Sequence, residues 1–329
     1  MMNGLNDTDD LELAPLGTGY MVRRDRLMSE LIVKGRKAGI VLLYAPDGFG
    51  KTSILLQYTQ EVKSDPTRGL VRIIEADRAI AREVFMQLEV VTDELEDKPR
   101  SLIAIDNVPN LDQQDTEELI DRIRGLRTMG IGVFVTCRPS NRQLIRGLGD
   151  SVKINAQMLK VHAYEYSAWA SAFSISTSLD FYQLTQGVPE LVSAMQTGLY
   201  GEGDVASLLE NEIVNVYGAA LADMASIDNG ALFNVACVMA LMGEGKIAEL
   251  EACGVRLSMI DQSYLVRDYP IFGVDPVDRS FTCMGTEDNA RLRLRKMVAE
   301  IRPELVMRAA RILLKAGRCD AAMDLADAF

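Results

Sequence analysis

Five short apolar runs recur along the first half of the chain, separated by longer amphipathic segments. The runs are GIVLLYA (39–45), LVRIIEA (70–76), SLIAIDN (101–107), IGVFVTC (131–137) and SVKIN (151–155). Near-continuous apolar strands that alternate with helices are typical of a parallel sheet with helices on both faces. One intervening segment, DTEELIDRIRGLRTMG, is expected to begin a helix with Asp115 as its N-cap and to end at Gly130. The pattern predicts an α/β domain over residues 1–160.

After about residue 156 the alternation stops and the apolar period becomes helical. Segments such as PELVSAMQTGL and VASLLENEIVNVYGAALADM predict a small helical domain over 161–222. Residues 223–286 mix helices with two short pieces expected to be extended, SYLVRDYP and RSFTCM, which predicts a winged-helix-like domain. Residues 287–329 are again helical, and PELVMRAARILLKAGRCDAAMDLADAF (303–329) within them reads as helix, turn and helix, like the first unit of a helical-repeat array. One unit cannot bury its own face, so we expect the chain to be a fragment of a longer protein.

Composition narrows the classes of partner. Apolar residues make up 48% of the chain and charged residues 25%, which is ordinary for a soluble globular protein. The formal net charge of −12 argues against DNA binding by this segment and against an anionic membrane surface, while a DNA-binding domain outside it stays open. The five cysteines form no Cys-x-x-Cys pair, as expected for reduced thiols. The acidic N-terminus is no secretory signal, and we expect a cytoplasmic protein.

The stretch LLYAPDGFGKTS (42–53) carries the strongest chemical signal. Its Ala45-x-x-x-x-Gly50-Lys51-Thr52 spacing follows the P-loop pattern, in which backbone N–H groups and the next helix cradle phosphates. Lys51 can reach the β- and γ-phosphates, and the Thr52 hydroxyl can bind Mg²⁺. The alternative is a simple strand-to-helix turn. We expect ATP or ADP to be bound by Asp47, Gly48, Phe49, Gly50, Lys51, Thr52 and Ser53.

Two further strand ends supply candidate catalytic groups. SLIAIDNV ends in Asp106, which has the form of a Walker B carboxylate for Mg²⁺, although many strands end in a purely structural aspartate. Asn107 follows, where many ATPases place an acid; an amide binds water but takes no proton from it. Arg138, in VFVTCRPS, is placed at the carboxyl end of the sheet to meet a γ-phosphate. Its alternative is a surface arginine before a proline turn.

Five segments together resemble the STAND-class signalling ATPases, which include the NB-ARC proteins and the maltose-activator-like LuxR-type regulators. They are VRRDRLMSEL (22–31), APDGFGKTS, LIAIDN, VFVTCR and TQGVPELV (185–192), the last resembling the family's Gly-x-Pro motif. The resemblance covers about residues 20 to 300 and is strongest through 192. It implies a nucleotide between a P-loop domain, a helical domain and a winged helix. The backbone near Val22 and Arg23 would hold adenine, and Pro189 would pack on it.

The resemblance also implies a switching cycle, and the chain departs from the family at two places. In the family ADP locks a closed form, and exchange for ATP with an inducer opens it for self-association. Many relatives carry a winged-helix histidine on the ADP phosphate, whereas His162 lies too early in this chain and is expected to be a packing or surface residue. Asn107 is the second departure. The inducer and output domain are not specified by these residues.

The sequence thus predicts a nucleotide-operated switch that is a weak ATPase at most. Two readings from other classes stay open. A motor or remodelling ATPase of the AAA+ type would want an acid after Asp106, and a nucleotide-free scaffold would not need Lys51, Thr52 and Asp106.

Overall fold

The first half of the molecule is built on a five-stranded parallel sheet. The computed structural model describes residues 24–65, 67, 69–76, 80–95, 97–98, 100–166, 182, 184–200, 204–227, 230–283 and 288–327. The strands are β1 (Ile40–Tyr44), β2 (Val71–Glu75), β3 (Leu102–Val108), β4 (Gly132–Cys137) and β5 (Val152–Asn155), in the spatial order β2-β3-β4-β1-β5. Every neighbouring pair is parallel. All five strands predicted from the apolar runs are confirmed.

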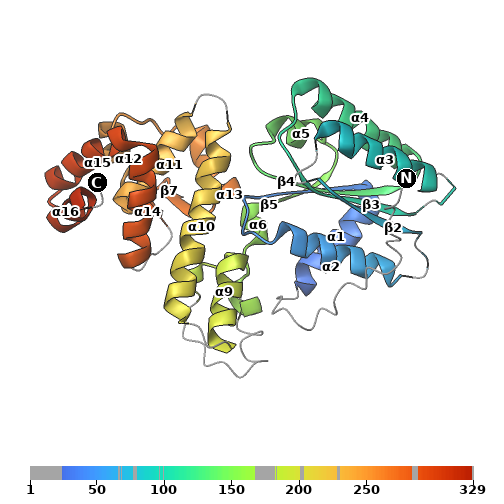
Figure 1. Cartoon of the computed structure of the whole chain (residues 1–329), viewed down its shortest axis with the longest axis horizontal. Coiled ribbons are helices and arrows are strands. Elements are labelled where there is room, and N and C mark those ends of the chain that lie inside the picture. The colour runs from blue at the N-terminus through green and yellow to red at the C-terminus, as the bar shows by residue number, and fades with distance from the viewer. Residues whose placement is uncertain are drawn as a thin grey trace, which may run out of the picture.

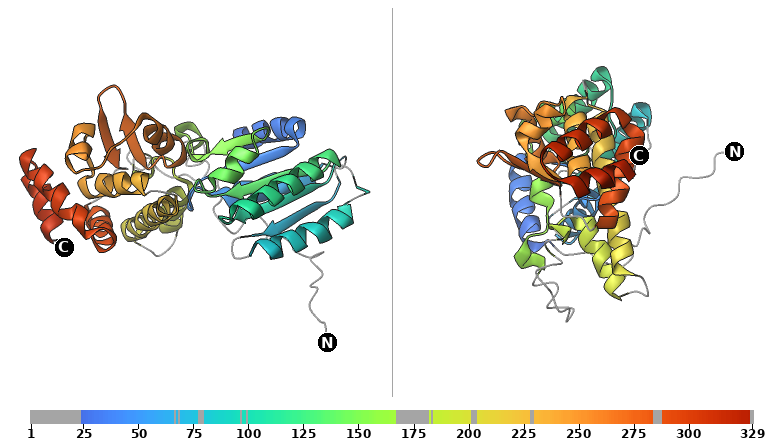
Figure 2. Two further views of the ribbon diagram at one scale, coloured as in Figure 1. Left: turned by 90° about the horizontal axis from the view of Figure 1, so that it is seen from above. Right: turned by 90° about the vertical axis from the view of Figure 1, so that its left-hand side faces the viewer.

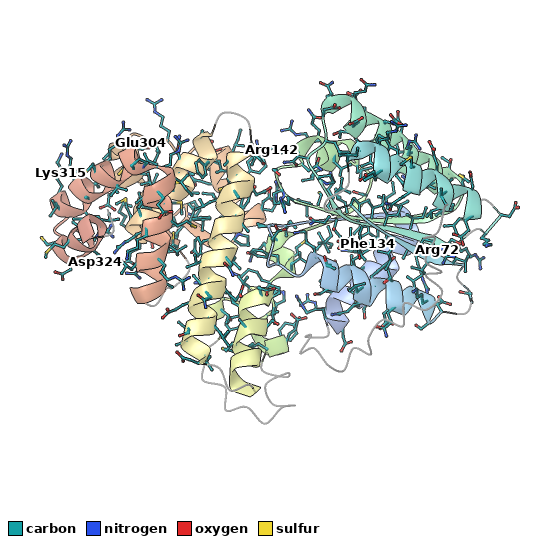
Figure 3. All side chains as sticks on the ribbon, in the orientation of Figure 1. Arg72, Phe134, Arg142, Glu304, Lys315 and Asp324 are labelled. Carbon is teal, nitrogen blue, oxygen red and sulfur yellow. The ribbon has the colours of Figure 1, made fainter. Side chains whose placement is uncertain are left out.

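Helices cover both faces of this sheet, as predicted (Figure 1). One face is covered by α1 (Asp25–Ala38) and α2 (Lys51–Lys63), and the other by α3 (Ala81–Leu95), α4 (Gln113–Thr128) and α5 (Arg142–Gly147). Successive side chains of β1 enter opposite cores because a strand alternates its faces: Val41 and Leu43 pack on the α1 and α2 side, Leu42 on the other. On the α1 and α2 side, the Phe134 ring lies 4.9 Å from that of Tyr58 (Figure 3).

The second half of the chain is mostly helical. After α6 (Ala156–Leu159) the described helices α9 (Pro189–Tyr200) and α10 (Val205–Ala225) pack side by side. They are followed in order by α11 (Ala231–Met242), β6 (Glu244–Lys246), α12 (Ile247–Ala252), α13 (Met259–Asp268), β7 (Phe272–Asp275) and β8 (Ser280–Cys283). The three strands form an antiparallel sheet in the order β6-β8-β7. The chain continues into α14 (Asp288–Ile301), α15 (Pro303–Lys315) and α16 (Cys319–Asp327).

The two halves lie side by side, with α10 and α13 next to the carboxyl edge of the parallel sheet (Figures 1 and 2). Helices α15 and α16 are at the far end of the molecule and form the predicted helix–turn–helix. None of the helices in the described ranges is long and apolar enough to cross a membrane. Cys137, Cys237 and Cys253 are buried free thiols, and burial raises the pKa of Cys137 to about 12.

Two local predictions are wrong. Helix α4 takes its N-cap from Asp112, whose carboxylate accepts a hydrogen bond of 2.8 Å from the Asp115 N–H, so that Asp115 lies in the first turn. SYLVRDYP, expected to be extended, lies mostly in α13. A capping box starts that helix: the Ser258 hydroxyl accepts from the Asp261 N–H at 3.1 Å, and the Asp261 carboxylate accepts from the Ser258 N–H at 3.2 Å. Residues 280–283 of RSFTCM form β8, as predicted.

Candidate nucleotide-binding site

The loop between β1 and α2 has a backbone that requires its glycines. Gly48 has φ +86° and Gly50 has φ +72°, a region that favours glycine. A Cβ on Gly48 would also lie 2.8 Å from Cγ2 of Val216 on α10. Helix α2 begins at Lys51, and no side chain caps its N-terminus at Gly50. The loop therefore presents the positive end of a helix and a tight backbone turn, the features that favour an anion.

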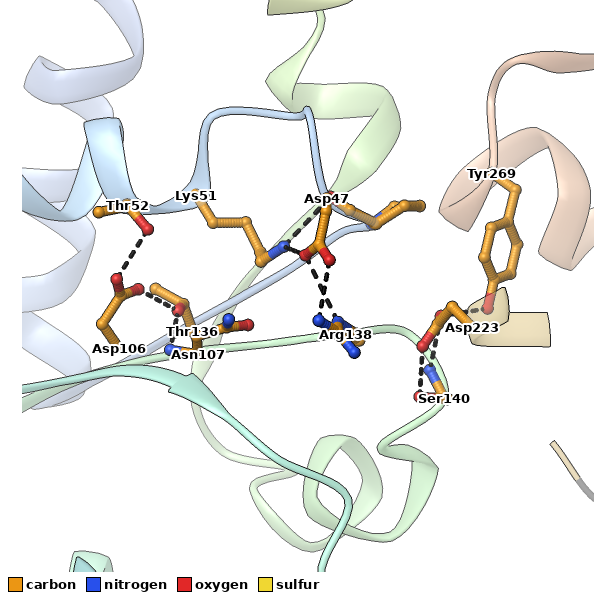
Figure 4. Close-up of polar contacts among 11 residues, drawn as sticks. Asp47, Lys51, Thr52, Asp106, Asn107, Thr136, Arg138, Ser140, Asp223 and Tyr269 are labelled. Atoms are coloured by element: carbon orange, nitrogen blue, oxygen red, sulfur yellow. Dashed lines mark hydrogen bonds and ion pairs between the residues drawn. The ribbon is translucent and has the colours of Figure 1, made fainter. Parts of the chain in front are cut away.

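Two cations meet at this loop through one carboxylate (Figure 4). Lys51 is only 6% exposed, and its Nζ donates to the Pro46 carbonyl at 3.1 Å and to Asp47 Oδ1 at 3.0 Å. Arg138, beyond the end of β4, contacts Asp47 Oδ2 through Nη2 at 2.9 Å. Partial burial opposes ionisation of Asp47, but the Lys51 ammonium and the Arg138 guanidinium outweigh it and lower the pKa of that carboxyl. The structure thus brings together Asp47, Lys51 and Arg138, which the sequence placed in one site.

The predicted magnesium ligands also lie side by side. Asp106, at 9% exposure, accepts hydrogen bonds from the Thr52 hydroxyl at 2.7 Å (Oδ2) and from the Thr136 hydroxyl at 2.5 Å (Oδ1). No cluster of three or more His, Cys, Asp or Glu suited to a metal occurs among the described residues. A hydroxyl and one carboxylate nevertheless fit Mg²⁺, which is commonly held by one or two protein groups together with phosphates and water.

Asn107 lies beside Asp106 at a β-bulge. The pairing of β3 with β4 shifts register between Ile105 and Val108, and Asn107 has φ +56°, a conformation that asparagine tolerates better than most residues. Its N–H donates to the Thr136 hydroxyl at 2.6 Å. The bulge places an amide residue at the carboxyl edge of the sheet, as the sequence predicted.

The helical half of the chain lies against the loop. The Glu190 N–H donates to the Gly48 carbonyl at 3.0 Å, and Cβ of Pro189 lies 3.4 Å from the position of a Cβ on Gly50. The turn before it contains Gly187, whose φ is +74°. Pro189 therefore lies against the loop between β1 and α2. Its predicted contact with adenine stays a prediction.

Val22 and Arg23, the predicted adenine-side residues, lie outside the described residues. Their neighbour Arg24, which the sequence did not single out, is 4% exposed. Its guanidinium donates to the carbonyls of Leu159 at 2.7 Å and Lys160 at 2.9 Å, and to Glu165 at 3.2 Å. Arg24 ties the start of α1 to the segment around α6. The VRRDRL segment contains this arginine, but the sequence does not indicate which arginine of the segment is buried.

A second group missed by the sequence joins the two halves. Asp223 on α10, at 4% exposure, accepts from the Ser140 hydroxyl at 2.5 Å, the Ser140 N–H at 3.2 Å and the Tyr269 hydroxyl at 2.6 Å. Burial raises the pKa of Asp223, and the hydrogen bonds from Ser140 and Tyr269 oppose that rise. Ser140 is two residues after Arg138, so the cluster lies next to the phosphate-side cation. His162, by contrast, is exposed and stacks on Tyr164 with ring centroids 5.6 Å apart.

Comparisons with known proteins assign no family to this chain. No protein-family model matches the chain, and no curated protein matches it either. Among solved structures, a RuvB variant from Thermotoga maritima is 14% identical over 84% of this chain and 95% of its own, with a TM-score of 0.40. The replication initiator DnaA bound to AMPPCP and single-stranded DNA is 14% identical over 91% and 94%, with a TM-score of 0.42. AMPPCP-bound DnaA from Aquifex aeolicus is 11% identical over 92% and 87%, with a TM-score of 0.37.

These values are too low to transfer the function of those proteins to this chain. The parallel sheet, the glycine-dependent loop after β1 and Asp106 near the carboxyl end of β3 are nevertheless consistent with an α/β P-loop NTPase domain.

Proposed function

We propose that this chain is an ATP/ADP-binding molecular switch of the STAND signalling type, with slow hydrolysis and nucleotide-dependent self-association. The observation that supports it most is the convergence of Lys51, Thr52, Asp106 and Arg138 around one glycine-dependent loop. The backbone of 47–51 and the side chain of Lys51 would bind the phosphates. Thr52 and Asp106 would hold Mg²⁺, which when bound neutralises phosphate charge.

Slow hydrolysis is proposed because Asn107, beside the Asp106 carboxylate, cannot act as a general base. A switch also needs a part of the protein whose position depends on which nucleotide is bound. Glu190 on α9 contacts the loop backbone, and Asp223 on α10 holds the segment after Arg138. The helical half is therefore in a position to respond to changes in the loop.

The STAND assignment itself has two structural supports. Pro189 lies against the loop, so a nucleotide bound there would meet the helical half of the chain. The order α11, β6, α12, α13, β7, β8, with its small antiparallel sheet, is compatible with the proposed winged helix. In this proposal ADP holds the closed arrangement, and ATP with an inducer favours self-association.

The first test is the dependence of nucleotide binding on Lys51. Lys51→Ala removes a charge-assisted contact to phosphate, typically about 1.5–3 kcal/mol, so ADP and ATP should bind at least about tenfold more weakly by calorimetry. Lys63→Ala, at the exposed end of the same helix, is the matched control and should bind normally. Unchanged affinity in a folded Lys51→Ala protein would overturn the phosphate assignment.

The alternative is a motor ATPase of the AAA+ type, which the intact set of Lys51, Thr52 and Asp106 also favours. The nucleotide carried by the purified protein separates the two. The protein is denatured and the supernatant is run on an anion-exchange column. Tightly held ADP supports the switch, rapid turnover of added ATP supports the motor, and a chain that binds no nucleotide is a scaffold.

A further inference from the structure

Asp47 places a negative charge inside a loop suited to phosphates. It lies between Pro46 and Gly48, at a position that the P-loop pattern leaves free. A carboxylate near bound phosphate is electrostatically unfavourable, because like charges repel most strongly where water is partly excluded. An acidic residue here therefore needs a role that compensates for this cost.

Both carboxylate oxygens of Asp47 hold a cation. Oδ1 lies 3.0 Å from Lys51 Nζ, and Oδ2 lies 2.9 Å from Arg138 Nη2. The two cations come from different elements, the first turn of α2 and the segment after β4, and they converge on the single side chain (Figure 4). The neighbouring acid, Asp106, is engaged by the hydroxyls of Thr52 and Thr136 and does not share these partners.

The same two cations have a predictable use in a P-loop. The loop lysine reaches the β- and γ-phosphates, and a planar guanidinium at the sheet edge suits the γ-phosphate. The rest of the cradle is made by backbone N–H groups and the N-terminus of α2, which do not depend on Asp47. A γ-phosphate must therefore compete with the carboxylate for both cations, whereas the β-phosphate of a diphosphate competes for Lys51 alone and is also held by the backbone cradle.

We propose that Asp47 sets the nucleotide preference of the loop by competing with the γ-phosphate for Lys51 and Arg138. The chain then holds a nucleoside diphosphate in preference to the triphosphate. This inference rests on the proposed function and adds a selectivity-determining residue to it. The effect is moderated by solvent, since the side chains of Asp47 and Arg138 are 43% and 45% exposed.

The test compares ADP and ATP affinities, measured by calorimetry with Mg²⁺, in the wild type and in Asp47→Asn. The asparagine keeps the shape and removes the charge. We expect the ratio of the ATP to the ADP dissociation constant to fall at least about tenfold, mainly through tighter ATP binding. Asp47→Ala should show the same direction, and Asp47→Glu should keep the ADP preference. Asp121→Asn, which removes a 79% exposed carboxylate from α4, is the matched control and should leave the ratio unchanged.

The dependence of the ADP preference on ionic strength is a second readout, and ATP hydrolysis does not influence it. Salt screens exposed charges, so raising it should narrow the ADP preference of the wild type and leave that of Asp47→Asn nearly constant. An unchanged ratio in folded Asp47→Asn and Asp47→Ala proteins would overturn the inference alone. Equal weakening of both nucleotides would also overturn it, because Asp47 would then only shape the loop. A wild type that binds neither nucleotide would overturn the proposed function, and the inference with it.

Discussion

Asn107 is the residue at which the chemistry of the site differs most from that of an efficient ATPase. Its backbone, with φ +56°, is set by the bulge in β3, and its N–H is bound to the Thr136 hydroxyl. Thr136 in turn donates to Asp106, so the amide and the proposed magnesium carboxylate share one hydroxyl. Hydrolysis needs a group that orients or deprotonates water in line with the γ-phosphate, and general-base help is typically about 10²–10⁴ in rate.

For this residue we predict hydrolysis slower than about one turnover per minute and a faster rate in Asn107→Asp. The aspartate restores a possible base, and its short side chain tolerates the left-handed backbone as asparagine does. We expect single-turnover experiments to show a rise of at least about tenfold, a conservative figure below the typical range of general-base effects. Asn215→Asp, on the exposed side of α10, should have the wild-type rate. A wild type that already turns over many ATP per second would contradict the prediction.

At the scale of elements, the connection into α9 determines how the helical half meets the loop. Gly187 has φ +74°, and its carbonyl accepts a hydrogen bond of 2.7 Å from the Val161 N–H. A Cβ at this position would lie 2.1 Å from the Val161 carbonyl oxygen, which is backbone and cannot rotate away. Two residues later Pro189 begins α9, where its fixed φ favours the first turn of a helix. This close approach aims the first turn of α9 at Gly48 and Gly50.

We therefore predict that Gly187→Ala lowers the free energy of unfolding by at least about 2 kcal/mol, because left-handed strain and a backbone clash add together. Gly125→Ala is the control: it lies within α4, and its Cβ would meet nothing within 4 Å. That substitution should stabilise the protein by about 0.5–1 kcal/mol, since alanine restricts the unfolded chain and favours a helix. Chemical denaturation of both variants measures the difference. Equal midpoints would show that the connection is less tightly packed.

For the whole molecule, the contacts between its two halves decide whether nucleotide chemistry can change its shape. Asp223 links α10 to Ser140 and Tyr269, and Arg142 lies over the Tyr264 ring, 4.5 Å from its centroid. Arg142 lies where the sheet half faces the helical half (Figure 3). Because the Asp223 carboxylate is buried, losing one of its donors leaves that acceptor incompletely paired.

Tyr269→Phe removes the hydroxyl that donates to Asp223, and we predict that it favours the open form. In sedimentation velocity, the variant should self-associate more than the wild type when ATP is present, and both should be mainly monomeric with ADP. Tyr164→Phe is a matched control because that hydroxyl is on a side chain 52% exposed and contacts only the exposed Arg26 in the structure described. Identical profiles for wild type and Tyr269→Phe in both nucleotides would show that this contact does not restrain the closed arrangement.

Local patterns along the chain were enough to predict the parallel sheet and to propose candidate residues for a site at its edge. Five apolar runs became β1 to β5, because a run buried on both faces of a sheet has few other stable structures. The loop glycines, Lys51 and Thr52 could be proposed because the spacing of a phosphate loop is local in sequence, and Asp106 because it follows an apolar run. Predictions from the sequence were less accurate where competing N-cap residues determine where a helix begins, as at Asp112 and at the start of α13.

What the sequence by itself determined is therefore the fold of the first half and which residues are candidates for phosphate binding. Only the tertiary structure decided which distant groups meet: Asp223 with Ser140 and Tyr269, 83 and 46 residues away. It also decided that the Asp47 carboxylate contacts both Lys51 and Arg138, the latter 91 residues further along the chain. Such pairings depend on packing whole helices against the edge of the sheet, and the burial that makes them strong exists only after folding. No local period or spacing encodes that burial.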